Sequence, residues 1–416
     1  MGISAGEVDD DFGYDPYSAA VMADPLPFYR VLRDKYPIYY IPKYDAYYLS
    51  RFEDVYEMLS QTDNTFVPSE GSRPPPEVFA APNHGIVQDA SLDPLAPHAF
   101  HSSPVYELLR QAHSKPFKPA PVRGLEEFIR GFVRERLDLL VPRGRFDLTQ
   151  HYGGITAAAV QCKLFRVPLI EAKYVLDTVN SASITDPVTG GYDPAARWDR
   201  VCEIVEPGVR ARRKEDRQDG SWPLVDGLLA AEINGRRLTD REIAMTIGAA
   251  LVGGTETLPK VVAHGIWELQ KRPEQMAAVR ADLARNVPIA FKEMVRYCGP
   301  AQWFTRTVRK PTVLAGQPMS VGQRVVFLIP SAARDEREYG PDAEEFRWDR
   351  KIDRWVNFGH GQHFCIGYHL ALLEGRILVE EFLRRVPEFT IDEARAVRRP
   401  SSFQWGWNEI PVVVPI

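Results

Sequence analysis

The stretch FGHGQHFCIG, residues 358–367, is followed at once by a helical pattern that runs from Tyr368 to Arg385. It holds Cys365 at the point where a loop turns into a helix. Backbone N–H groups at a helix N-terminus carry partial positive charge, so they favour a thiolate over a thiol. Glycines at 359, 361 and 367 let a bulky group approach the backbone closely. The stretch therefore predicts a metal ligand beside a large flat cofactor, with Phe358 packing on that cofactor or shielding the sulfur.

Three interpretations of this stretch compete. The first is a zinc site, although structural zinc ligands normally come as two separated pairs. The second is a haem iron with a cysteine axial ligand. The third is a cysteine buried as a small hydrophobic residue, an interpretation that gives the neighbouring glycines and histidines no role. On these residues alone all three stay open. The candidate zinc ligands are His360, His363, Cys365 and His369.

The pattern Phe358-x-x-Gly361-x-His363-x-Cys365-x-Gly367, followed by Ala371-x-x-Glu374, resembles the haem-binding signature of cytochrome P450 monooxygenases. Other motifs of that family lie upstream in the expected order. The resemblance implies haem b with Cys365 as the axial ligand of the iron. It also implies a mainly α fold with small β-sheets (α+β), in which the haem lies between a long central helix and the helix after the cysteine. One domain over residues 1–416 is expected.

Composition excludes some classes of protein. The 416 residues are 44% hydrophobic, which is ample for a core, and a net charge of -5 does not point to nucleic acid. The four cysteines show no paired spacing, which favours a reducing compartment. The polar arm over about residues 1–20 contains no apolar segment that could span a membrane. A cytoplasmic protein without a membrane anchor is predicted.

Upstream of the signature the chain alternates between regular and irregular segments. Helices are predicted over 25–35 and 52–60, with two short strands between them at 38–50. Residues 65–104 are rich in Pro, Ala, Ser and Gly, and a loop of that length in a compact domain predicts a substrate-binding segment. Helices follow to about residue 240, including 126–140 and 152–165. Residues 181–193 are predicted to form a mobile connection and the charged run 210–219 a solvated face.

The longest helical pattern opens with a capping box, Thr239-x-x-Glu242, and continues to about Lys271. At 1.5 Å per residue it would extend for roughly 48 Å. Two glycines and Pro259 interrupt its middle, and a proline removes one helical hydrogen bond, so the helix is predicted to open there and leave room for dioxygen. Here Gly253 would let the ring approach the backbone. Glu256-Thr257 resembles the acid–alcohol pair of the family, with Thr257 and Glu256 as the catalytic proton donors.

Further family elements follow from the resemblance. Glu293-x-x-Arg296, on a helix expected over 289–297, resembles a structural pair that locks the core near the haem, and Phe346 and Arg350 match the meander after it. Strands are expected within 312–330, and a strand pair within 403–416. The haem propionates would be neutralised by His363, Arg306 and Arg110, because buried carboxylates need charged partners. One departure is Tyr106, which stands where the family usually has a histidine.

The implied activity is that of a monooxygenase that uses O2 to oxidise a lipophilic small molecule: a terpenoid, a steroid-like or an aromatic compound. The chain carries no flavin or nicotinamide fingerprint, so the electrons are expected from a ferredoxin and its NAD(P)H-dependent reductase. The protein is expected to be a monomer. The predicted substrate pocket comprises Ala249, Val252, Ala301, Gln302, Phe304, Phe403 and Gln404, and the predicted ferredoxin surface comprises Lys115, Lys118, Lys351, Arg354 and His113.

Two other functions are weighed against this one. A peroxygenase driven by hydrogen peroxide would not need the pair Glu256-Thr257. A haem-binding sensor without turnover would need neither that pair nor a forty-residue binding loop.

Overall fold

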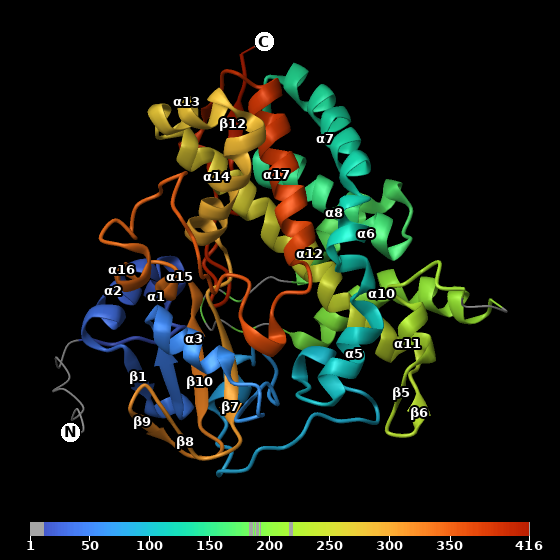
Figure 1. Cartoon of the computed structure of the whole chain (residues 1–416), viewed down its shortest axis with the longest axis vertical. Coiled ribbons are helices and arrows are strands. Elements are labelled where there is room, and N and C mark those ends of the chain that lie inside the picture. The colour runs from blue at the N-terminus through green and yellow to red at the C-terminus, as the bar shows by residue number, and fades with distance from the viewer. Residues whose placement is uncertain are drawn as a thin grey trace.

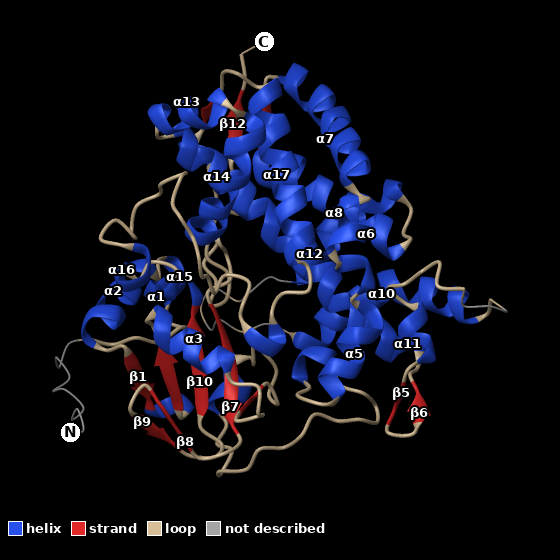
Figure 2. Cartoon of the chain, viewed as in Figure 1, coloured by secondary structure: helices blue, strands red, loops and turns tan. Residues whose placement is uncertain are grey.

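The computed structural model describes residues 12–182, 186, 188, 191, 193–215 and 219–415. Helices fill most of the molecule and the largest sheet lies at one corner (Figures 1 and 2). The first half contains α1 (Ala19–Ala23), α2 (Leu26–Lys35), α3 (Phe52–Ser60), α4 (Pro76–Ala80), α5 (Val105–His113), α6 (Pro119–Arg123), α7 (Glu126–Leu140), α8 (Ile155–Phe165), α9 (Ala172–Ala182) and α10 (Pro194–Arg213). The second half contains α11 (Asp226–Ala230), α12 (Asp240–Gln270), α13 (Pro273–Ala281), α14 (Leu283–Cys298), α15 (Ile329–Ala332), α16 (Glu336–Tyr339) and α17 (Tyr368–Arg385).

The strands are short and form four separate sheets. This mainly helical architecture with small sheets confirms the predicted fold class. The strands are β1 (Ile38–Ile41), β2 (Ala46–Leu49), β3 (Phe66–Val67), β4 (Arg145–Asp147), β5 (Glu232–Ile233), β6 (Arg236–Arg237), β7 (Trp303–Val308), β8 (Thr312–Leu314), β9 (Gln317–Met319), β10 (Arg324–Leu328), β11 (Thr390–Ile391) and β12 (Pro411–Val413).

The helix α12 crosses the helical part of the molecule (Figure 1). Its capping box is formed as predicted, since Thr239 accepts from the N–H of Glu242 and the Glu242 side chain accepts from the N–H of Thr239. The helix stays continuous through Pro259, so the opening predicted there is not a break. Along its length α12 contacts α8, α10, α14 and α17, and this packing supports a continuous helix. The buried side chains of Ile247, Leu251 and Ile266 belong to the large core formed there.

The largest sheet has the strand order β1-β2-β10-β7-β3. The predicted hairpin of β1 and β2 is confirmed, and β10 runs parallel to β2 but antiparallel to β7. All five residues of β10 are buried, which explains the apolar run that follows Arg324. The irregular segment 65–104 is tied to this sheet, because Arg324 of β10 donates to both carboxylate oxygens of Glu70 at 2.7 Å.

Several local predictions need correction. The tail does not form its own strand pair: β12 pairs with β4 and β11, which come from distant parts of the chain. The helix α14 begins six residues before Ile289, the predicted start. The charged run is not only a solvated face, because Arg212 is 3% exposed and donates to Asp226. Residues 1–11 and most of 181–193 lie outside the described residues, and none of the described helices combines the length and apolar character needed to cross a membrane.

Candidate functional site

The Cys365 loop, residues 358–367, folds back on itself before α17 begins. The N–H of Cys365 donates to the carbonyl oxygen of Phe358 at 2.8 Å, which closes the loop. Gly359 and Gly361 adopt positive φ angles of 70° and 65°, a region that favours glycine. A Cβ at Gly361 would lie 2.2 Å from the carbonyl oxygen of Leu59, so no side chain fits there. The loop is therefore built to lie close against its surroundings.

A cavity of about 400 Å³ lies between α12 and the Cys365 loop with the start of α17. From α12 it is lined by Ala249, Gly253 and Thr257, and from the loop and α17 by Cys365 and Leu370. A Cβ at Gly253 would meet no atom within 4 Å, so this turn of α12 is open to the cavity. The position between the central helix and the helix after the cysteine is the one predicted for a flat cofactor.

The environment of Cys365 differs from the expectation. Burial raises the pKa of its thiol, while the N–H groups of Gly367 and Tyr368 act in the opposite direction. Burial outweighs the start of α17, so the protein surroundings alone do not favour the thiolate. A bound metal ion makes the deprotonated form the ligand, because a cysteine binds metal only as thiolate.

A buried arginine without an acidic partner lies at the cavity wall. Arg306 on β7 is 6% exposed and donates to the carbonyl oxygen of Thr305 at 2.8 Å. Its guanidinium lies 5.6 Å from the ring centroid of Phe327. Burial lowers the pKa of Arg306 to about 10, and no acidic side chain of the described residues forms an ion pair with it. A desolvated charge in this state needs an anion that the chain does not supply.

Three further polar side chains continue this positive region. Arg110 donates to the hydroxyl oxygen of Tyr106 at 2.7 Å, and the rings of Tyr106 and His363 are 3.9 Å apart between centroids. Burial lowers the pKa of His363 well below its ordinary value, and the nearby charges of Arg306 and Arg110 lower it further. The four side chains predicted to meet the haem propionates thus line one cavity.

These residues fit haem b. The thiol offers an iron ligand, the glycines leave open backbone, and the cations match two carboxylates that must be buried. The zinc interpretation does not fit: no three His, Cys, Asp or Glu side chains gather as a metal site within the described part of the chain. Instead His360 stacks on Tyr56 with 4.1 Å between ring centroids, and His369 is exposed.

The acid and the alcohol of α12 face different surroundings. Thr257 lines the cavity and donates its hydroxyl hydrogen to the carbonyl oxygen of Gly253 at 2.7 Å. Glu256 does not line it; its carboxylate lies 3.8 Å from the ammonium nitrogen of Lys260 and 3.9 Å from the guanidinium of Arg197. Consecutive helical residues point about 100° apart, which explains the division. Only the alcohol can contact a molecule in the cavity directly.

The cavity includes only part of the predicted substrate pocket. Ala249, Ala301 and Phe304 line the cavity, whereas Val252, Gln302, Phe403 and Gln404 do not. Val252 faces the core on another side of α12. The other three belong to contacts around the cavity wall: Gln302 accepts from the hydroxyl of Tyr29 at 2.9 Å, Phe403 packs on Phe304, and Gln404 accepts from Lys260.

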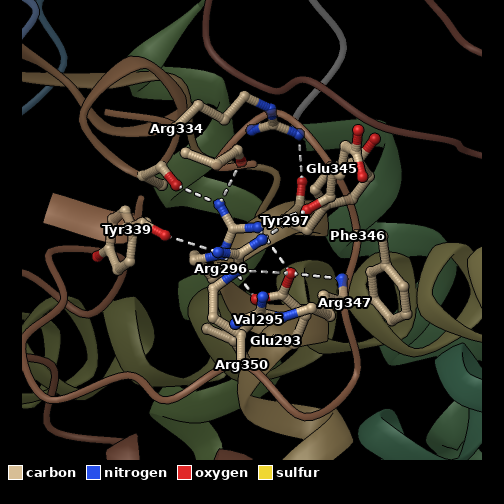
Figure 3. A network of polar contacts seen from close by, with 12 residues as sticks. Glu293, Val295, Arg296, Tyr297, Arg334, Tyr339, Glu345, Phe346, Arg347 and Arg350 are labelled. Atoms are coloured by element: carbon tan, nitrogen blue, oxygen red, sulfur yellow. Dashed lines mark hydrogen bonds and ion pairs between the residues drawn. The ribbon is translucent and has the colours of Figure 1, made fainter. Parts of the chain in front are cut away.

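Glu293 and Arg296 form a fully buried ion pair on α14 (Figure 3). The guanidinium donates to both carboxylate oxygens at 2.6 Å and to three backbone carbonyl oxygens. Arg350 of the predicted meander also donates to Glu293, at 3.3 Å. A surface pair is thereby excluded. Asn357, next to the Cys365 loop, donates to the carbonyl oxygens of Val295 and Arg296, which ties this network to the loop.

Several residues that line the cavity were given no site role by the sequence reasoning, among them His98, Glu374 and Gln161. His98, from the irregular segment, stacks on Tyr106 with 5.9 Å between centroids, and burial lowers its pKa to about 3. Glu374 is buried, and burial raises its pKa to about 8. Gln161 enters the cavity wall from α8. Only Glu374 carried a signal, an acid on the inner face of an amphipathic helix; the others depend on which way a loop or helix turns.

Comparisons with known proteins agree on one family. The family profile described as Cytochrome P450 matches residues 195–405. The chain is 29% identical to "Putative cytochrome P450 123" of Mycobacterium tuberculosis, over 98% of both chains. It is 34% identical to "Steroid C26-monooxygenase" of Mycolicibacterium smegmatis, over 51% of each. A solved structure of a P450 EryK mutant in complex with erythromycin B superposes with a TM-score of 0.78 at 26% identity, covering 95% of this chain and 97% of that one.

Proposed function

The chain belongs to the cytochrome P450 family of haem-thiolate monooxygenases, and on that premise we propose that it oxidises a lipophilic small molecule with O2 and electrons from a ferredoxin. Its cofactor is haem b. When bound, haem with a cysteine thiolate ligand supplies the activation of dioxygen. The residues proposed to hold it are Cys365 at the iron, Arg306, Arg110, His363 and Tyr106 at the carboxylates, and Phe358 and Gly253 against the ring.

One observation carries the proposal. A single cavity is lined by the thiol of Cys365, by the unpartnered cation of Arg306 and by the hydroxyl of Thr257. A sensor needs the first two but not the third. An alcohol at an open turn of α12 supports proton delivery to oxygen, which is the task that separates a monooxygenase from a haem carrier.

The roles of the acid and the alcohol follow from their hydrogen bonds. Because the Thr257 hydroxyl donates to Gly253, its oxygen lone pairs are free to accept from a protonated group in the cavity. Glu256, held between Lys260 and Arg197 at the far side of α12, is proposed to bring protons from solvent. Arg197 and Lys260 then act as positioning residues, because they determine where that carboxylate points.

The substrate is proposed to be apolar and of moderate size. Aliphatic and aromatic side chains supply much of the wall, among them Leu59, Ala249, Phe304, Phe327 and Ile329. The irregular segment 65–104 contributes Ser72, His98 and Ala99. Relatives are named for a steroid and complexed with a macrolide, which is compatible with a steroid-like or terpenoid substrate; an aromatic compound also fits.

We propose a smaller ferredoxin surface than the one predicted from the sequence. His113 is fully buried and cannot contact a partner. Lys351 pairs with Asp353 at 3.0 Å, and Arg354 pairs with Glu338. Lys115 and Lys118 are exposed, and neither forms an ion pair with a described residue. We therefore assign the acidic ferredoxin to the surface around these two lysines.

Turnover assays separate the candidate functions. Product from NADH with a surrogate ferredoxin and reductase supports the monooxygenase. Product with hydrogen peroxide alone identifies a peroxygenase, and haem binding without product under both conditions identifies a sensor. A panel of lipophilic compounds, scored by the change in haem spin state, identifies the substrate class. The cytoplasmic location, the monomeric state and the single-domain organisation stay predictions.

A further inference from the structure

Gln161 is a polar residue on an otherwise apolar stretch of α8. Its side chain is 1% exposed to solvent and forms part of the cavity wall. It lies directly against α12: a Cβ at Gly254 would be 2.1 Å from Nε2 of Gln161. The glycine at 254 therefore makes room for this amide as well as for a flat ring. Gln161 reaches the same open turn of α12 that bears Thr257.

The amide of Gln161 has no hydrogen-bond partner among the residues that the structure describes. Its Oε1 is fully buried and unpaired, and no hydrogen bond of its Nε2 to a described residue exists. A buried polar group without a partner costs about 1–3 kcal/mol. Such groups in native proteins are usually paired by an ordered water or a ligand. Because Gln161 lines the cavity, that partner can enter from there.

Polar groups on α12 complete the surroundings of such a partner. Thr257 lies one turn after Gly254, and its oxygen can accept a hydrogen bond while its hydrogen is held by Gly253. Glu256 points away from the cavity. Proton transfer from the Glu256 carboxylate to the cavity therefore needs a group that lies between them.

We propose that the Gln161 amide holds an ordered water beside Gly254, and that this water and Thr257 together pass protons to the oxygen being reduced. Per turnover, one O2 takes up two electrons from the ferredoxin and two protons; one oxygen atom enters the substrate and the other leaves as water. If the protons arrive in the wrong place, the same electrons and protons leave as hydrogen peroxide. Gln161 acts through the water and is a positioning residue. The inference rests on the proposed function.

The test uses the haem-loaded protein and three variants. Gln161→Leu keeps the size and removes the amide, while Gln161→Asn keeps an amide one carbon shorter. Thr156→Val is the matched control, because Thr156 is a buried polar residue of α8 that donates to the carbonyl oxygen of Tyr152, just before the helix, and does not line the cavity. The measurements are the C–O stretching frequency of the reduced CO complex, thermal unfolding, and product and hydrogen peroxide per NADH.

We expect Gln161→Leu to shift the C–O stretch and to lower product per NADH by roughly fivefold, the value of one lost hydrogen bond, with the difference recovered as peroxide. Gln161→Asn should have a C–O stretch and a product yield per NADH between those of Gln161→Leu and the wild type. If Gln161→Leu does not fold, the Gln161→Asn protein tests the inference. Thr156→Val should keep the wild-type stretch and coupling. A Gln161→Leu protein equal to the wild type, or to Thr156→Val, overturns the inference. A wild type without the thiolate-type CO band overturns the proposed function instead.

Discussion

Arg296 and Arg306 are both buried, yet the chain treats their charges in opposite ways. Arg296 is 0% exposed and makes five hydrogen bonds, two of them to the carboxylate of Glu293. Arg306 is 6% exposed and makes one, to the carbonyl oxygen of Thr305. A guanidinium has five N–H donors, so the first is saturated by the protein and the second is not.

This difference distinguishes a structural charge from a binding charge. The Arg296 network joins α14 to the meander (Figure 3). Asn357 connects it to the Cys365 loop. Nothing is left for a ligand to satisfy. Around Arg306 the neighbour Arg110 adds a second positive charge, while His363, whose pKa is lowered well below its ordinary value, adds a neutral polar ring and no carboxylate. An unpaired charge buried in this way destabilises the protein, and an anion from outside the chain would remove that penalty.

The largest effect is expected from a substitution in the Arg296 network, where the protein itself pairs the charge. Arg296→Ala leaves the Glu293 carboxylate buried beside Arg350 alone, which should cost about 3–5 kcal/mol of unfolding free energy. Urea unfolding of the apoprotein and the haem-loaded protein should show the same loss. Arg347→Ala is the control, because its pair with Asp342 is exposed and should be worth less than about 1 kcal/mol. Equal stability of both variants would contradict a structural role for the pair.

On the ligand side, Cys365→Ser should abolish the thiolate-type Soret band of the reduced, CO-bound protein. A serine hydroxyl does not replace the thiolate as an iron ligand of the same electronic character. Urea unfolding of the apoprotein should change little. Cys298→Ala serves as the control, since Cys298 is buried near the Arg296 network and away from the cavity. A colourless wild-type protein that contains zinc would refute the haem assignment.

Arg306→Met tests whether the unpaired charge of Arg306, unlike that of Arg296, destabilises the apoprotein while it helps to retain haem. Removing an unpaired buried charge should leave the apoprotein as stable as the wild type or more stable, by up to about 1–3 kcal/mol. The haem-loaded protein should instead release haem faster, measured by transfer to a haem-free globin. Arg110→Ala should also release haem faster. Only for Arg306 do we expect a substitution that leaves the apoprotein at least as stable and yet weakens haem retention. A loss of apoprotein stability in Arg306→Met would give Arg306 a structural role like that of Arg296.

A smaller effect concerns the reaction itself. Thr257→Ala should keep haem content and NADH consumption, while product falls severalfold and hydrogen peroxide takes up the missing electrons. Glu256→Gln should slow oxygen consumption rather than divert it. Thr255→Val is the control, because Thr255 is buried, bonds Leu251 and does not line the cavity. Full coupling in Thr257→Ala would remove this residue from proton delivery.

The smallest effect lies at the surface, where solvent weakens every charge. The double variant Lys115→Glu and Lys118→Glu should raise the KM for ferredoxin by roughly two- to tenfold and flatten its dependence on salt. Lys351→Glu should do less, because Asp353 already neutralises Lys351. Identical ferredoxin kinetics in the double variant and the wild type would place the partner elsewhere.

Elements with local signals could be predicted from the sequence by itself. The capping box marked the start of α12, apolar spacing marked α7, and tyrosine-rich segments within residues 38–50 marked β1 and β2. The motif around Cys365 indicated the cofactor, and the spacing of Glu293 and Arg296 indicated their pairing. Helix hydrogen bonds and caps join residues within four positions, so the information lies within a short window.

Only the tertiary structure decided what faces the cavity and what its charges meet. Val252 turns away while Gly253 opens to it, because rotation about α12 is set by packing on several neighbours at once. The partner of β12 is β4, and the residue beside Gly254 is Gln161; both come from far along the chain. Whether an arginine is saturated, like Arg296, or left for a ligand, like Arg306, depends on acceptors that distant segments bring. No short window of sequence contains them, because long-range packing alone chooses those neighbours.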